Sequence, residues 1–423
     1  MTQNYRVLHK DSQLPNLFGI ILCNFGDHMK SIAHKRKSII LILLIILVMS
    51  NFTITFAYWT STIQGSFTQN NATVNIGNWP FVPPGSTVLT EEVLIDLLNG
   101  DLPLDGDYVL VGDIDLSTYE NNEFDPISNF TGTFEGNGYT IGGFTINNTN
   151  TTPGTEIGIF INTGVDSEIS NVNVENVTVT QTDNSGGSNT NETTYIGVLV
   201  GTNNGTISNV EVLDSQINGG NIVNSGIFNS SSLSLYAGGL VGRNNGTIIN
   251  SYARVNVTLN SSVSTSFLSS STGTTYVGGL VGYNMGTISQ SYATGNVLND
   301  VDTSTGFLAT VTINTYTGGL VGLNASGGNV FEVFATGNVT LEIEGNSGSQ
   351  YLGRVVGRNL GNTSELYRLN TQSITTGYIQ NSANTISTTI ENLQSSVFLS
   401  ETLGFDFVNV WEPVVGDYPI LKE

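Results

Sequence analysis

Two pairs of carboxylates have the spacing that acid–base chemistry on a β-strand would need. Asp113 and Asp115 lie in VGDIDLS, and Glu342 and Glu344 lie in LEIE. Alternate residues of a strand point to the same face, so each pair would place its carboxylates side by side. Such pairs hydrolyse glycosides, and carboxylate oxygens also bind calcium. With 34 acidic residues in the chain, pairs of this spacing also arise by chance, and a solvated acidic face is the commoner explanation.

Other types of catalytic side chain are confined to the start of the sequence. The single cysteine, Cys23, and all three histidines, His9, His28 and His34, precede Ser38. The rest of the chain therefore has no means to form a histidine-containing triad, a cysteine nucleophile, a histidine-ligated zinc site or a disulfide. It also contains no GGxGxDx repeat and no EF-hand loop. We expect no catalytic, cofactor-binding or metal-binding residues, and therefore no enzyme.

The N-terminal segment has the pattern of an export signal. The basic cluster at 35–37 precedes an apolar stretch over 38–58, and Thr55-Phe56-Ala57 resembles a cleavage site after Ala57. A start at Met29 would give the signal an ordinary length. If it is not cleaved, the stretch is long enough to anchor the chain in a bilayer. We therefore expect residues 1–57 to be a leader, and the remainder to be secreted or at the cell surface.

The charge of the exported part limits its partners. Six of the 12 basic residues but only two of the 34 acidic residues precede Ser38, which leaves 6 basic and 32 acidic residues and a formal charge of −26. Such a body will not bind nucleic acid or an anionic membrane surface by electrostatics. We expect an extracellular glycan or protein as partner, with membrane contact only through the N-terminal segment.

The elements that must position any site belong to a repeat. A glycine-rich segment recurs behind the tyrosines at 195, 236, 276, 316 and 351, which are 41, 40, 40 and 35 residues apart, and a weaker copy begins at Ile157. β-Branched and aromatic residues alternate with polar ones after each copy, as in 247–257, which is the period of a half-buried strand. The pattern predicts a β-solenoid with either two coils per repeat or one coil that carries a protruding loop.

Glycines and one asparagine recur at fixed offsets within each copy. Glycine permits positive φ at corners and close approach of neighbouring coils, and asparagine also tolerates left-handed corners. The asparagines could also form a hydrogen-bonded ladder if successive copies occupy successive coils. These structural positions are Gly197, Gly201, Asn203, Gly238, Gly239, Gly242, Asn244, Gly278, Gly279, Gly282, Asn284, Gly318, Gly319, Gly322, Asn324, Gly353, Gly357 and Asn359.

The segments between repeats, such as 224–234 and 261–275, consist of Ser, Thr, Asn and Gly with an occasional Phe or Leu. They are interpreted as spacers or as loops on a binding face. Residues 58–88 are predicted to be a linker, 89–423 the solenoid and 398–423 an aromatic C-terminal cap. A short helix with Thr90 as its N-cap should cover the first coil, and residues 136–138 should form a turn.

The segments GGLVGRNNGTI, GGLVGYNMGTI and GGLVGLN resemble the GLUG motif, with further similarity over about 108–421. That repeat occurs in bacterial surface and secreted proteins, including adhesins and some metallopeptidases that cleave immunoglobulin A. The resemblance implies a right-handed parallel β-helix at the cell surface. It does not imply peptidase activity, because those enzymes hold zinc through an HExxH motif that this chain lacks.

Two classes of function follow. The favoured one is a non-enzymatic surface or secreted solenoid that displays its inter-repeat loops to a ligand, as an adhesin does. The alternative is a carbohydrate-active β-helix that binds or cleaves polysaccharide through its carboxylates. A self-assembling coat component is a third possibility, against which the aromatic C-terminal cap argues.

Overall fold

The computed structural model describes residues 65–69, 72–76, 80–118, 126–148, 155–181, 191–220, 222–225, 227–345, 348–375 and 383–422. The chain divides into two compact units, Met1–Pro80 and Phe81–Glu423. In the first, β1 (Gly65–Gln69) and β2 (Ala72–Ile76) form an antiparallel hairpin within the expected linker. The apolar segment 38–58 and Ala57 lie outside the described residues. Among the helices that are described, none has the length and hydropathy to cross a membrane.

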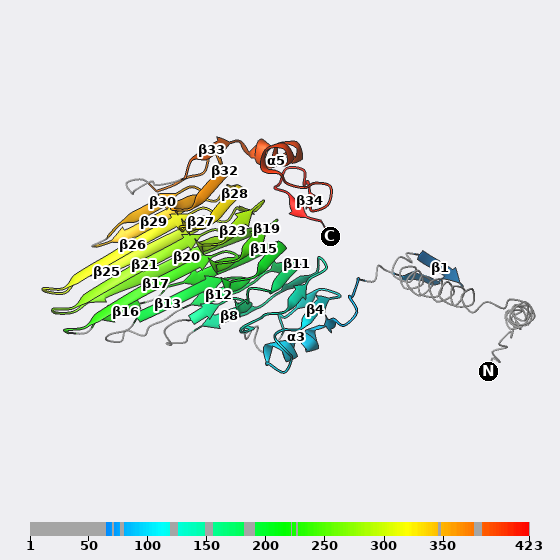
Figure 1. Ribbon diagram of the computed structural model, residues 1–423, viewed down its shortest axis with the longest axis horizontal. Helices are drawn as coiled ribbons and strands as arrows, with labels where there is room; N and C mark the ends of the chain where they lie inside the picture. Colours follow the sequence, from blue (N-terminus) through cyan, green and yellow to red (C-terminus); the bar gives the residue numbers. More distant parts are fainter. Residues whose placement is uncertain are drawn as a thin grey trace, which may run out of the picture. The chain divides into compact units, whose positions relative to one another are not determined.

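The second unit is an all-β parallel solenoid, which confirms the predicted fold class (Figure 1). One six-stranded sheet, called here the tyrosine sheet, contains β9 (Thr155–Ile157), β13 (Asn191–Gly197), β17 (Ser230–Gly238), β21 (Ser270–Gly278), β26 (Thr310–Gly318) and β30 (Gln350–Gly353). A second, the asparagine sheet, contains β10 (Phe160–Asn162), β14 (Val200–Asn203), β18 (Val241–Asn244), β22 (Val281–Asn284), β27 (Val321–Asn324) and β31 (Val356–Asn359).

A third sheet, the large sheet, completes the coils. Its first part contains β3 (Thr87–Leu89), β4 (Asp107–Leu110), β5 (Ile114–Asp115), β6 (Thr133–Glu135), β7 (Thr140–Gly142), β8 (Thr145–Asn148), β11 (Glu168–Glu175), β12 (Thr178–Gln181), β15 (Thr206–Gly219) and β16 (Ile222–Ser225). Its second part contains β19 (Thr247–Ile249), β20 (Tyr252–Thr265), β23 (Thr287–Ser289), β24 (Tyr292–Ala293), β25 (Val297–Ser304), β28 (Asn329–Ala335), β29 (Val339–Glu344), β32 (Asn362–Leu369) and β33 (Thr385–Thr388).

Each repeat forms one coil. Tyr195 is paired with Tyr236, which is paired with Tyr276, and the register continues to Tyr316 and Tyr351. The alternative of two coils per repeat is therefore wrong. A coil takes 40 residues because its strands are long: β20 alone has 14 residues, and every second one points into the core. Burying one Val, Leu or Ile stabilises the fold by about 1.5–3 kcal/mol.

The repeat glycines allow close packing of the backbone rather than left-handed corners. None of the repeat glycines has positive φ. A Cβ on Gly238 would lie 2.2 Å from the Val241 carbonyl oxygen, and one on Gly279 would lie 2.2 Å from the Gly319 carbonyl oxygen. Of the two reasons expected for these glycines, the structure therefore shows close approach, whereas positive φ is wrong for them.

The repeat asparagines form a ladder inside the asparagine sheet. Asn203, Asn244, Asn284 and Asn324 each donate from Nδ2 to Oδ1 of the next asparagine at 2.8 Å, and the ladder ends at Asn359. The expectation that these asparagines adopt a left-handed corner is wrong. Positive φ is instead found in another column, called here the left-handed corner column, with one residue in each of six successive coils: Asn171, Asn209, Asn250, Gln290, Glu332 and Glu365.

Helix α3 (Glu91–Leu98) begins where the sequence predicted, with the Thr90 side chain accepting a hydrogen bond from the Val93 N–H. Its Leu94 and Leu97 are buried. The predicted turn at 136–138 is also present, with φ of 51° at Asn137 and 80° at Gly138. It does not form a hairpin, because β6 and β7 each pair in parallel with strands of other coils.

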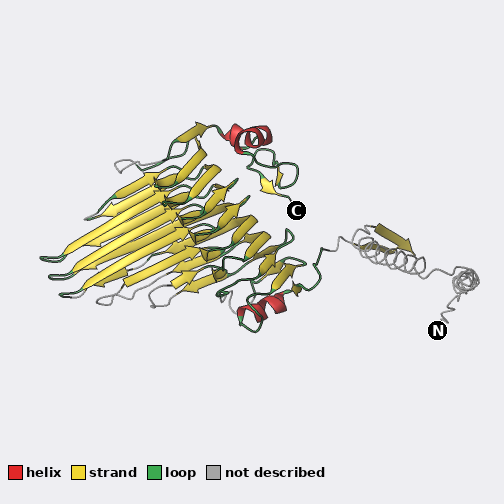
Figure 2. Cartoon of the chain, in the orientation of Figure 1, coloured by secondary structure: helices red, strands yellow, loops and turns green. Residues whose placement is uncertain are grey.

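The C-terminal segment contains α4 (Ile390–Leu393), α5 (Ser396–Leu403), β34 (Trp411–Glu412) and β35 (Ile420–Leu421); helices lie near both ends of the stack (Figure 2). Residues 396–422, called here the clasp, pack on a flank of the solenoid. The fully buried Trp411 ring lies 5.9 Å from both Tyr252 and Tyr292, which belong to consecutive coils. The aromatic cap therefore covers a side of the stack and joins several coils.

Candidate functional site

Three long arms extend from the solenoid between the large sheet and the tyrosine sheet. Their described residues are 222–225 and 227–234 in the first arm, 262–274 in the second and 302–314 in the third, and they lie side by side in register. In Figure 1 they are the outer ends of β16, β17, β21 and their neighbours. The sequence suggested solvated loops here, whereas the arms are ordered pairs of strands. Inside them Leu233, Val263 and Ile313 are fully buried.

Two apolar residues form the turn at the tip of each arm. These six residues, called here the crest, are Ile227, Phe228, Phe267, Leu268, Phe307 and Leu308. All are exposed, Phe228 at 72% and Phe307 at 74%. The rings of Phe228 and Phe307 each lie 6.0 Å from that of Phe267. The crest is thus a continuous apolar edge across three coils.

The crest has an unusual backbone. Phe228, Leu268 and Leu308 have φ of 60°, 49° and 54°. A left-handed conformation costs an L-residue with a bulky side chain roughly 1–2 kcal/mol. Glycine or asparagine at these positions would remove most of that strain. The crest therefore combines exposed apolar side chains with a strained backbone on three successive turns.

The flat face of the arms in the tyrosine sheet is lined by small polar side chains. Its outward residues are Ser230, Ser232, Ser234, Ser270, Thr272, Thr274, Thr310, Thr312 and Asn314. Across the three arms the sequence contains one charged residue, Asp302, at the base of the third arm. Apart from Asp302, the arms are therefore uncharged extensions of a strongly acidic body.

Closer to the core, the tyrosine sheet carries a column of stacked tyrosine rings. Tyr195, Tyr236, Tyr276, Tyr316 and Tyr351 stack in sequence with ring centroids 4.5–5.2 Å apart. Burial, and then the neighbouring Tyr195, raise the pKa of Tyr236 to about 12. Because each internal ring uses both faces on its neighbours, this column offers little area on which a sugar ring could stack.

The first predicted carboxylate pair lies at an open hollow of about 280 Å³, together with Glu175 and Asn176. Asp113 accepts a hydrogen bond from the Thr140 N–H at 2.8 Å, and Asp115 accepts one from the Ser117 N–H at 2.9 Å. The bond from Ser117 lowers the pKa of Asp115. A general acid needs the opposite shift, so Asp115 is suited to holding the turn rather than to donating a proton.

The second pair lies on the outward face of the large sheet. Glu342 and Glu344 are paired with Asp300 and Asp302 of the neighbouring strand. Burial, and then the adjacent carboxylates, raise the pKa of Asp300. No group of three or more potential ligands is arranged to hold a metal ion within the part of the chain that the structure describes. The structure therefore leaves the two predicted pairs apart in separate regions of the solenoid.

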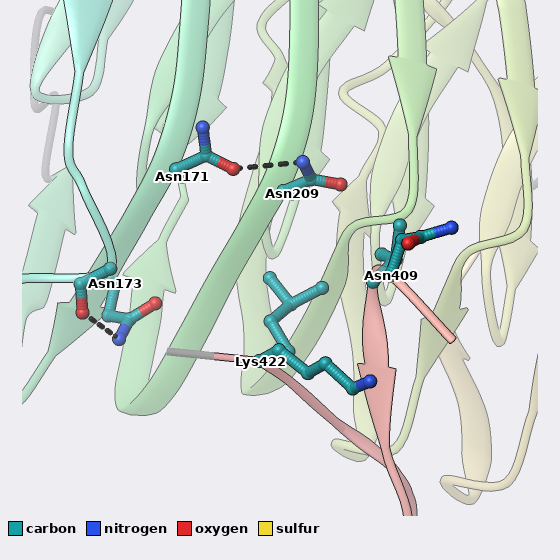
Figure 3. Close-up of a pocket in the computed structure, with 8 residues that line it drawn as sticks. Asn171, Asn173, Asn209, Asn409 and Lys422 are labelled. Atoms are coloured by element: carbon teal, nitrogen blue, oxygen red, sulfur yellow. Dashed lines mark hydrogen bonds between the residues drawn. The ribbon is translucent and has the colours of Figure 1, made fainter. Parts of the chain in front are cut away.

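A small polar hollow lies where the clasp meets the left-handed corner column (Figure 3). Asn171, Asn173, Asn209, Asn409 and Lys422 are among its lining residues. Asn209 donates from Nδ2 to Asn171 Oδ1 at 2.9 Å, while its own Oδ1 is buried without a protein partner. The volume, about 60 Å³, is that of roughly two water molecules. The hollow is therefore too small to hold an organic ligand of ordinary size.

A buried carboxyl group lies beneath the clasp. Glu211 is 8% exposed and accepts a hydrogen bond from the Tyr252 hydroxyl. Burial raises its pKa, while hydrogen bonds from Tyr252 and from the Leu421 N–H, together with the Arg254 charge, oppose the shift. Arg254 also forms an ion pair with Asp417 of the clasp at 2.8 Å.

We predict that Glu211→Gln stabilises the protein at pH 8 and has little effect near pH 4. A carboxyl group whose pKa is raised by folding favours the folded state while it is protonated. That contribution is lost as pH rises from the ordinary pKa of the group through its raised value. Thermal midpoints at both pH values measure the effect, with Glu412→Gln on the exposed part of the clasp as control. Equal pH dependence of wild type and variant would contradict the prediction.

Sequence reasoning missed the crest, although its signal is in the sequence. The apolar pairs at 227–228, 267–268 and 307–308 recur 40 residues apart within segments rich in serine and threonine. Alignment of the inter-repeat segments, and not only of the glycine-rich ones, would have found it.

The comparison with family models agrees with the repeat that the structure shows. The family model described as the GLUG motif matches residues 234–258 and 273–298, which contain the glycines and asparagines of two successive coils. No curated protein matches the chain. Among solved structures, a Bacteroides ovatus protein provisionally named an immunoglobulin A1 protease is similar, with a TM-score of 0.44 and 16% identity. The match covers 78% of this chain and 89% of that one. The chain thus contains repeats of the GLUG motif.

Proposed function

We propose that this protein is a non-enzymatic extracellular solenoid that adheres to a ligand through the crest of its three arms. The main observation that supports this proposal is the crest, which has six exposed apolar residues on adjacent turns, three of them in strained left-handed conformations. Large exposed apolar patches on otherwise soluble proteins mark interaction sites. The export-like N-terminal segment supports a location at the cell surface or in the medium.

The raised pKa of Asp300, among four carboxylates, favours polysaccharide cleavage as the second candidate function. The group lies on the outward face of a sheet, where its strand alternates with the buried Val301. A glycosidase instead holds its two carboxyl groups on either side of an enclosed sugar. Adhesion is therefore the better-supported function.

A binding screen separates the two functions. The full chain is applied to arrays of glycans and extracellular-matrix proteins, with and without calcium, and released sugars are measured in the same wells. We expect saturable binding without product, and weaker binding by a variant with Phe228→Ser, Phe267→Ser and Phe307→Ser. Release of sugar that persists in this variant and stops in Asp300→Asn would replace adhesion by the enzymatic function.

A further inference from the structure

We propose that the crest inserts into the interfacial region of a lipid bilayer with neutral or zwitterionic headgroups. This inference rests on the proposed adhesive function and names the class of partner at the same site. It departs from the expectation that membranes are contacted only through the N-terminal segment. That expectation came from the acidic charge, which opposes anionic membranes and does not oppose uncharged ones.

The distribution of charge in the arms favours lipid over a protein groove. From Thr303 outward the third arm has no charged residue, and the first two arms have none along 222–234 and 262–274. Charged groups are costly to move into a bilayer, whereas the rim of a protein–protein interface is polar and accepts them. A chain with 34 acidic residues that leaves three adjacent tips uncharged has the charge pattern needed for insertion.

The backbone of the crest is also suited to a medium with little water. The Phe228 N–H donates to the Phe267 carbonyl at 3.3 Å, and the Leu268 N–H donates to the Phe307 carbonyl at 3.2 Å. Just behind the crest, Ser270 donates to Asn229 and Thr310 donates to Ser269, both at 3.0 Å. Backbone groups must have partners inside a bilayer, and the lateral stacking of the arms provides partners for the N–H groups of Phe228 and Leu268.

The layers behind the crest match the polarity of a membrane interface. Asn229, Ser230, Ser266, Ser269 and Thr310 follow the apolar residues on either side of the turns. Uncharged hydroxyl and amide groups at this depth can hydrogen-bond to headgroups and interfacial water. The acidic body makes tip-to-tip pairing of two copies unfavourable, since both copies carry the same large charge.

The test measures binding of the full chain to phosphatidylcholine vesicles by co-flotation. Because residues 38–58 are apolar themselves, the contribution of the crest is the difference between variants. We expect the triple variant Phe228→Ser, Phe267→Ser and Phe307→Ser to bind at least about tenfold more weakly, since membrane binding scales with buried apolar area. The matched control, Val165→Ser with Val408→Ser and Val415→Ser, removes exposed apolar residues outside the arms and should bind as wild type does.

A local probe reports insertion directly. Phe267→Trp places an indole on the crest, and its emission, after subtraction of the wild-type signal, should shift to the blue on phosphatidylcholine vesicles and be quenched by brominated acyl chains. Addition of phosphatidylglycerol should weaken the effect at low salt. Unchanged emission on vesicles that carry the protein, or equal flotation of triple variant and wild type, overturns the proposal. If the triple variant loses binding only to a matrix protein, the crest binds protein, and the adhesive function survives without lipid.

Discussion

Gly238→Ala is expected to destabilise the solenoid by about 3 kcal/mol or more, because overpacking against an immobile backbone is among the costliest core changes. A Cβ at this position would lie 2.2 Å from the Val241 carbonyl oxygen and 2.6 Å from the Val281 Cα. Both atoms belong to the backbone, so no side chain can move aside to make room. Val281 lies in the next coil, so the methyl group would push neighbouring coils apart.

Thermal and urea unfolding followed by circular dichroism would measure this effect, and the midpoint should fall by roughly 5–10 °C. Gly112→Ala is the matched control: Gly112 has no heavy atom within 4 Å of the added carbon and has no positive φ. That change should be neutral or slightly stabilising, because alanine restricts the unfolded chain. Equal midpoints for the two variants would show that the coils can separate at Gly238 without loss of stability.

These glycines illustrate how far the sequence determines the fold. Their fixed offsets, and the alternation that follows them, predict strands stacked in a solenoid, because a period of two and a repeat near 40 residues leave few other arrangements. The number of coils per repeat could not be derived from the sequence. A 14-residue strand such as β20 has the same alternation as two shorter strands joined by a turn, and only pairing between coils distinguishes them.

The asparagines show a second limit. An Asn suited to a left-handed corner and an Asn that bonds to the next coil are the same residue type, and both recur once per repeat. The ladder asparagines lie inside, whereas the corner column changes from Asn171, Asn209 and Asn250 to Gln290 and the two glutamates that follow it. The corner column, whose residue type varies, has the strained backbone. The invariant asparagine of each repeat is therefore explained by hydrogen bonding between coils rather than by local backbone conformation.

The candidate site was the least predictable part. Segments rich in Ser and Thr have the composition of a loop. The alternation of polar and apolar residues in them, however, also fits an arm of paired strands that buries residues such as Leu233 and Val263. The exposed position of Phe228, Phe267 and Phe307 depends on the turn at each tip, which follows from the register of three coils. The position of the clasp was equally hard to predict. Its aromatic residues were recognised in the sequence, but Trp411 contacts Tyr252 and Tyr292, which are more than 100 positions away in the sequence.

Asn284→Ala is expected to cost about 2–4 kcal/mol, since it removes several hydrogen bonds at a fully buried position and opens a small cavity. Asn284 is fully buried. Its Oδ1 accepts from Asn244 at 2.8 Å, and its Nδ2 donates to Asn324 at 2.8 Å and to the Gly286 carbonyl at 3.1 Å. Alanine removes these bonds and a fourth, from Nδ2 to the Asn329 carbonyl at 3.5 Å, and it deprives Asn324 Oδ1 of the side-chain donor that it has in the ladder.

The cost of removing an asparagine depends on its position in the ladder. Asn359, at the end of the ladder, is therefore the control for Asn284. Asn359 is half-buried and accepts from Asn324, whose Nδ2 also bonds to the Gly328 and Asn362 carbonyls. Asn359 also donates from Nδ2 to Thr363 Oγ1 at 3.3 Å. Asn359→Ala should therefore cost about 1–2 kcal/mol, the net contribution of two hydrogen bonds at a half-buried position. Urea unfolding of both variants measures the difference. A cost at Asn284 no greater than that at Asn359 would mean that the ladder bonds act independently of burial, and that side-chain packing alone holds the coils in register.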